Sequence, residues 1–193
     1  SDAERDLLVS YVIHLSLRGE AEYRLLRRLL DETDEPPGNL DDEARAILRS
    51  ALRGWLEADA HAIRPSFMPT PSNVDAKLEA DHQESIRRGF NLFGQEAAGC
   101  LKCHEDYGRQ TRYRYDVWGT VVRPADLTEG AYKGGRRPED LFHRIRGGIG
   151  PSGMPAAESL TESQVWDLVH FVLALPQPKL LPPEVRSRIY PQR

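Results

Sequence analysis

The chain has 193 residues, and 26 Lys and Arg against 30 Asp and Glu give it a formal net charge of −4 at pH 7. That balance excludes the global positive field of a nucleic-acid-binding protein, and no apolar run approaches the ~20 residues that a membrane-spanning helix needs. The length fits one large domain or two small ones.

The first third of the chain is predicted to be helical. Residues 1–16 carry apolar side chains at helical spacing: Leu8, Tyr11, Val12 and Leu15. Residues 17–32 continue as a helix with leucines on one side. A Pro- and Gly-containing break at 33–39 follows, and Asn39 is placed to cap a helix over 40–62. Nothing in this part carries a pattern typical of catalysis.

A weak internal repeat relates residues 1–16 to residues 161–175 near the other end of the chain. At an offset of 160, five apolar pairs coincide: Leu8 with Leu168, Val9 with Val169, Tyr11 with Phe171, Val12 with Val172, and Leu15 with Leu175. The similarity has two interpretations, chance likeness between two amphipathic helices or common descent. In the second case residues 1–16 are the closing helix of an upstream domain of the same kind as the second half of this chain.

A second domain is predicted to begin near Asp81, which can cap a helix with Glu84 at its third position. Gly89 lies one turn before Phe93 and offers bare backbone for a close helix crossing. The natural crossing partner is the helix 161–175, which ends before a proline.

Two further helices of this half have clear ends. Pro138 is suited to the first position of a helix over 138–146 and Gly147 to the position after it. Thr161 and Gln164 form a capping-box pair at the start of the last helix.

The most informative stretch is Cys100-Leu101-Lys102-Cys103-His104. A C-x-x-C-H run is typical of covalent haem c attachment: two thiols bond to one haem and the histidine binds its iron. A structural zinc site would need four ligands, and both cysteines of the chain are already used here. A thioredoxin-type dithiol would need a βαβ context, which the flanks do not show, and a simple disulfide leaves the histidine unexplained.

Together these features make residues 83–176 resemble class I cytochromes c. The matching features are the Gly89/Phe93 helix, the C-x-x-C-H run, Pro124-x-x-Leu127, Gly153-Met154-Pro155, and a closing helix with Leu168 and Phe171. The resemblance implies an all-α class I cytochrome c fold around one haem c bound through Cys100 and Cys103, preceded by a helical extension. The chain departs from the family in a longer stretch between Phe93 and Cys100 and in an Arg/Tyr-rich insertion over 105–123. It is also similar to the second half of two-domain, dihaem bacterial cytochromes c.

His104 is the expected proximal ligand, and its other ring nitrogen should donate a hydrogen bond to a carbonyl. The resemblance assigns that carbonyl to Pro124. For the second axial ligand the sequence offers Met154, set between turn residues, where a loop can present its sulfur. The rivals are Met68, His82, His143 and His170.

Arg123 and Trp118 are the first candidates for contact with the haem propionates. An arginine suits bidentate contact with a carboxylate, and a buried Trp seeks a hydrogen-bond acceptor.

These features predict three segments: a helical extension and linker over 1–80, a haem domain over 81–176 and a Pro-rich tail over 177–193. The linker 64–80 is also rich in proline. The tail is expected to wrap the domain or dock on a partner.

The favoured function is electron transfer without catalysis, because a six-coordinate His/Met iron leaves no site for a substrate. The protein would exchange electrons with redox partner proteins, either as a free carrier or as a haem subunit of a larger respiratory complex. The alternative is a haem enzyme, a peroxidase or small-ligand reductase, with an open or displaceable sixth position. Because bacteria attach haem c after export, Ser1 is interpreted as a mature or cleaved start and the location as periplasmic or otherwise exported, with any membrane association through a partner.

Overall fold

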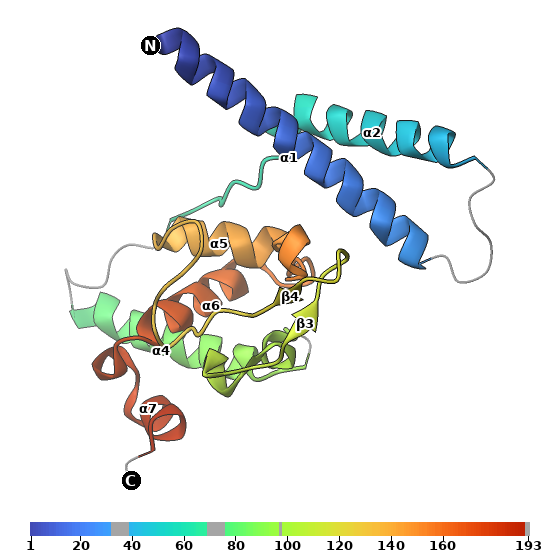
Figure 1. Cartoon of the computed structure of the whole chain (residues 1–193). Helices are drawn as coiled ribbons and strands as arrows, with labels where there is room; N and C mark the ends of the chain where they lie inside the picture. The colour runs from blue at the N-terminus through green and yellow to red at the C-terminus, as the bar shows by residue number, and fades with distance from the viewer. Residues whose placement is uncertain (32–38, 69–75, 97, 192–193) are drawn as a thin grey trace. The chain divides into compact units, whose positions relative to one another are not determined.

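The computed structural model describes residues 1–31, 39–68, 76–96 and 98–191 (Figure 1). Residues 33–38 of the predicted break and 69–75 of the predicted linker lie outside these ranges. Contacts divide the chain into two units, Ser1–Ala62 with Val117–Thr120, and Ile63–Asp116 with Val121–Arg193. The division falls earlier than the expected boundary at 80/81 and assigns a short loop of the second half to the first unit.

The first unit consists of α1 (Asp2–Asp31), α2 (Leu40–Leu56) and α3 (Ala58–His61). Side-chain contacts join α1 to α2: Trp55 Nε1 donates to Glu20 Oε2 at 2.5 Å, and Arg28 pairs with Glu43 at 3.2 Å.

Asn39 caps α2 as predicted, since its side chain accepts from the backbone N–H groups of Asp41 and Asp42. Two helix boundaries in this unit were predicted wrongly. Residues 1–16 and 17–32 form one continuous helix, because no helix-ending residue separates them and the Arg18–Glu22 pair (2.6 Å) reinforces the turn just after the junction. The predicted helix 40–62 is interrupted by a turn at Glu57.

The second unit is built on α4 (Ala76–Phe93), α5 (Pro138–Gly147), α6 (Glu162–Ala174) and α7 (Pro183–Ile189). Short 3-10 turns lie at Cys100–Lys102, Asp106–Gly108, Gly150–Ser152 and Pro178–Leu180. Figure 1 shows α6 between α4 and α5.

Two small antiparallel ladders complete this unit and were not predicted. β1 (His104–Glu105) pairs with β2 (Gln110–Thr111), with His104 opposite Thr111. β3 (Arg114–Tyr115) pairs with β4 (Val121–Val122), with Arg114 opposite Val122. Strands of two residues leave too little alternation to read from a sequence.

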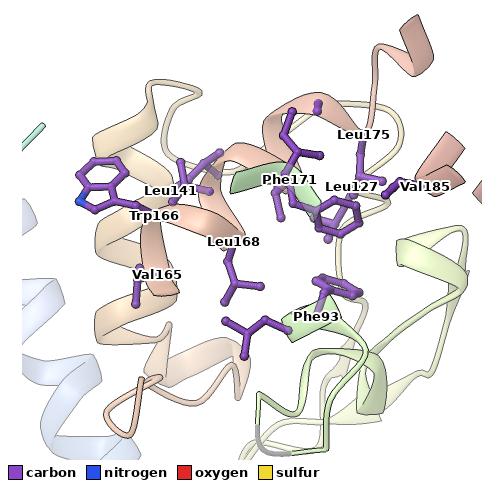
Figure 2. Packing of buried hydrophobic residues seen from close by; sticks show 14 of the residues in the cluster. Phe93, Leu127, Leu141, Val165, Trp166, Leu168, Phe171, Leu175 and Val185 are labelled. Atoms are coloured by element: carbon purple, nitrogen blue, oxygen red, sulfur yellow. The ribbon is translucent and has the colours of Figure 1, made fainter. Parts of the chain in front are cut away.

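The core of the second unit forms where α4 crosses α6, as the bare backbone at Gly89 predicted. A Cβ at Gly89 would lie 2.0 Å from the carbonyl oxygen of Asp167 and 2.8 Å from Cβ of Phe171. This close approach lets Ile86 of α4 and Leu168 and Phe171 of α6 become almost fully buried. Figure 2 shows the cluster running from Trp166 and Leu141 at one side to Leu175 and Val185 at the other.

The predicted helix cap at Asp81 is wrong, because α4 already begins at Ala76. Residues 76–80 are mostly strong helix formers, so the helix has no reason to begin at a cap five residues later. The capping box of α6 is confirmed: Gln164 N donates to Thr161 Oγ1, and Thr161 N donates to Gln164 Oε1.

α5 ends one residue later than predicted. Gly147 belongs to the helix, and Gly148 takes the positive φ of 71°. A Cβ on Gly148 would lie 2.6 Å from the carbonyl oxygen of Met154, so the loop can fold back onto the helix end only over a glycine.

The C-terminal tail is part of the core. Leu181, Val185 and Ile189 are buried in the same cluster as α4 and α6, and the Tyr190 hydroxyl donates to the carbonyl of Leu175 at 2.7 Å. The expectation that the tail wraps the haem-binding half fits this packing. Among the described residues, none of the helices is both long and apolar enough to cross a membrane.

Candidate haem site

The two motif cysteines lie on one short turn. Cys100 opens the 3-10 turn Cys100–Lys102, and the backbone N–H of Cys103 donates back to the carbonyl of Cys100 at 3.2 Å. Gly99, at φ 67°, turns the chain into it. In a 3-10 turn the side chains three residues apart lie one above the other, so both sulfurs leave the backbone on the same side.

Neither sulfur is in a disulfide, although their environments differ. Burial raises the pKa of the Cys100 thiol to about 11, so this thiol stays protonated at neutral pH. Cys103 Sγ accepts a hydrogen bond from Arg114 Nη1 at 3.0 Å, a contact that the sequence did not reveal.

His104 follows directly and is held by one hydrogen bond. Its Nδ1 donates to the carbonyl of Ala125 at 3.1 Å. The prediction of the Pro124 carbonyl is therefore wrong by one residue, since the spacing of the loop alone could not fix which carbonyl faces the ring. Burial lowers the pKa of His104, which favours the neutral imidazole, and the hydrogen bond to Ala125 leaves Nε2 as the nitrogen that can bind a metal.

The segment after His104 is fastened to two other parts of the second unit. Gly108, at φ 93°, has no side chain, and a Cβ there would lie 2.6 Å from Leu127 N. Arg109 donates to the carbonyl of Ile189 at 2.6 Å and lies over the Tyr190 ring at 5.0 Å from its centroid. The turn is therefore joined both to the Ala125–Leu127 stretch and to the end of α7.

Tyr107 connects this turn to the core. Its ring is stacked near Phe90 (5.9 Å between centroids) and Phe93 (5.7 Å), and meets Phe171 edge-on at 5.9 Å. Aromatic groups from α4, α6 and the turn thus meet beside the motif.

Met154 is presented by a loop with several anchors. Ile149 N donates to the carbonyl of Met154 at 2.9 Å, and Ala157 N donates to the carbonyl of Ile145 at 3.0 Å. Arg146 of α5 adds hydrogen bonds to the carbonyls of Ala157 and Leu160. The loop therefore has a defined path across the end of α5, with Met154 partly buried.

The rival ligands are engaged elsewhere or exposed. His170 Nδ1 lies 2.8 Å from Ser85 Oγ, and the ring of His170 is 4.6 Å from that of His82. His143 is exposed on α5, and Met68 is 51% exposed. In the described part of the chain, no group of three or more His, Cys, Asp or Glu is arranged to hold a metal ion, so a zinc site gains no support.

The two predicted propionate contacts are placed differently. Trp118 belongs to the first unit, where its ring lies 5.8 Å from Tyr23. Arg123 stays in the second unit, exposed at the end of β4 and one residue before Pro124.

The residues of the motif fit a covalent haem. Two unlinked thiols share one side of a turn, the following imidazole is neutral with Nε2 left for iron, and a second, methionine-bearing loop belongs to the same unit. Partly buried Cys100, Ile145 and Ala157 pack against the apolar cluster, which offers the kind of lining that a porphyrin needs.

One family model and one solved structure are similar to parts of this chain. The family model described as cytochrome C oxidase, cbb3-type, subunit III matches residues 84–172. A solved structure of the reducing HAO-like protein complex Kustc0457/Kustc0458 from Kuenenia stuttgartiensis is 25% identical, covering 79% of this chain and 71% of that one with a TM-score of 0.48. No curated protein matches the chain. The second half of the chain is thus a c-type cytochrome domain with the class I fold, preceded by a helical extension, and its chemistry is haem-based electron transfer.

Proposed function

We propose that the chain transfers electrons through one haem c, attached to Cys100 and Cys103 and ligated by His104 and Met154. The observation that carries the proposal is the hydrogen bond from His104 Nδ1 to Ala125, which orients the ring and leaves Nε2 for iron. When bound, the haem takes up and releases single electrons at a potential set by its axial ligands and surroundings.

The chain's own residues would attach the haem, orient His104 and supply the second ligand. The thiols fix the cofactor at two points, and Ala125 keeps His104 in one tautomer. The loop anchored through Ile149 and Arg146 would supply the thioether of Met154 as the second ligand, which would leave no open site for a substrate. On this proposal the domain is not itself an enzyme, and chemistry takes place on its redox partners.

The spectrum of the matured protein tests the ligand set. A c-type spectrum unmoved by carbon monoxide, with the weak far-red band of Met–iron coordination in the ferric state, is expected. Met154→Ala should lose that band, whereas Met68→Ala, which removes the only other methionine, should keep it. Ready binding of carbon monoxide by the unaltered protein would support the alternative of a haem enzyme, and the search for a distal residue would begin at His143.

We also propose that residues 1–16 close another cytochrome-like domain. One structural fact adds to the internal repeat. The large apolar side chains from Leu7 to Leu15 are 44–71% exposed.

The matching residues of α6 show what such a helix requires, because Leu168, Val169, Phe171, Val172 and Leu175 are all buried. A helix that is apolar on most sides is normally packed inside a domain. Intact mass spectrometry of the protein isolated from its source should find two haems on one longer chain. A single haem on that chain would contradict the proposal.

We further propose that the protein is exported and acts either as a free carrier or as a subunit of a larger redox complex. Covalent haem attachment outside the bacterial cytoplasm supports a periplasmic protein. Size measurement of the native protein at its cellular concentration separates a free carrier, which runs as a monomer, from a fixed subunit, which co-purifies with partner chains.

A further inference from the structure

The contact between Arg114 and Cys103 lies in the segment that departs most from class I cytochromes c. Most of the two small ladders lies in this segment, residues 105–123, and the register Arg114↔Val122 sets the orientation of the β3–β4 hairpin. From this hairpin the Arg114 guanidinium reaches Cys103 Sγ at 3.0 Å.

Two neighbouring arginines of the same segment form ion pairs with carboxylates instead. Arg109 pairs with Asp106 and Arg112 with Glu105, both at 2.9 Å, so each charge is offset by a carboxylate. Across the described ranges, the partner of Arg114 is the sulfur of Cys103 and no carboxylate pairs with it. A full positive charge therefore stands against one of the two haem-attachment atoms.

We propose that Arg114 is a positioning residue that raises the reduction potential of the haem and holds the β3–β4 hairpin against Cys103. This inference rests on the proposed attachment of haem through Cys103. Reduction adds one negative charge to the haem, and a nearby positive charge stabilises that form by an energy that falls with distance. Because Arg114 is exposed, solvent and salt weaken the effect without removing it.

The experiment is redox titration of the matured protein and its Arg114→Gln variant. Removing the charge should lower the equilibrium constant for reduction about five-fold, roughly 40 mV at 59 mV per tenfold for one electron. Arg114→Lys should restore most of the potential. Raising the ionic strength should shrink the difference between the unaltered protein and Arg114→Gln, which a purely structural role of the side chain would not predict.

The double variant Arg112→Gln/Glu105→Gln is the matched control, because it removes an ion pair from the same segment and leaves the net charge unchanged. Its shift should be clearly smaller. Equal shifts in the two variants, or no shift in Arg114→Gln, would overturn the inference. Arg114→Met, which keeps an apolar stem, provides a second neutral variant should Arg114→Gln fail to mature.

Two separate measurements distinguish a wrong role for Arg114 from a wrong assignment of haem attachment. A pyridine haemochrome spectrum of the unaltered protein first establishes whether two thioether bonds are present. Without them the proposed attachment fails, whereas with them the potentials decide on Arg114 alone.

Discussion

Substitution of Gly89 by alanine is the sharpest test of the packing that forms the haem-binding half. The added Cβ would lie 2.0 Å from the backbone oxygen of Asp167, whereas ordinary contacts begin at 3.4 Å. The helices α4 and α6 would have to separate by about 1.4 Å (3.4 − 2.0), because the nearest obstacle is backbone and cannot rotate away.

Two effects of opposite sign decide the result. Alanine favours a helix over glycine by about 1 kcal/mol, while overpacking a core costs about 1–3 kcal/mol and sometimes more. Since the contact is backbone to backbone, we expect the upper part of that range and a net loss of about 2 kcal/mol or more in the free energy of unfolding. Urea unfolding, followed by haem absorption and by circular dichroism, measures it.

Gly54→Ala is the matched control, since Gly54 also lies within a helix but a Cβ added there would meet no atom within 4 Å. It should stabilise its own unit by up to about 1 kcal/mol. If Gly89→Ala were as stable as the unaltered protein, the close crossing of α4 and α6 would be refuted.

Two other perturbations test the same unit. Burial first, and the neighbouring His82 second, lower the pKa of His170 to about 4, so between pH 6.5 and 4 the unfolded chain binds a proton that the folded chain does not. The free energy of unfolding should therefore fall with decreasing pH by about 3 kcal/mol over that window; unfolding at pH 7, 5.5 and 4 would show it, and His170→Gln should flatten the dependence. Tyr190→Phe removes the hydrogen bond to Leu175 and should cost about 1 kcal/mol, whereas an unchanged denaturation midpoint would mean that the tail is not held there.

The cytochrome c domain and the helix crossing could be predicted because both depend on short-range patterns. The spacing of Cys100, Cys103 and His104 is typical of haem c attachment, and the apolar residues near Gly89 recur at the helical period. The caps at Asn39 and Thr161 were predicted correctly because a side chain that accepts from a backbone N–H three residues away or fewer needs no tertiary information.

Predictions that depended on long-range geometry were less accurate. The choice between the carbonyls of Pro124 and Ala125 depends on how a loop twenty residues away is turned, which spacing does not encode. The contact of Arg114 with Cys103 arises from a hairpin whose strands are two residues long. The placement of Trp118 beside Tyr23 depends on a division of the chain that composition does not show.

The fastening of the turn after His104 has a consequence for speed. Electron transfer is slowed by every dipole that must shift when the charge on the metal changes, and groups fixed in advance keep that reorganisation energy low. Gly108 presses the turn against Leu127, and Arg109 ties it to Ile189 and Tyr190. The helix α7 thus takes part in holding the turn after His104, although Ile189 lies 80 residues from Arg109 along the sequence.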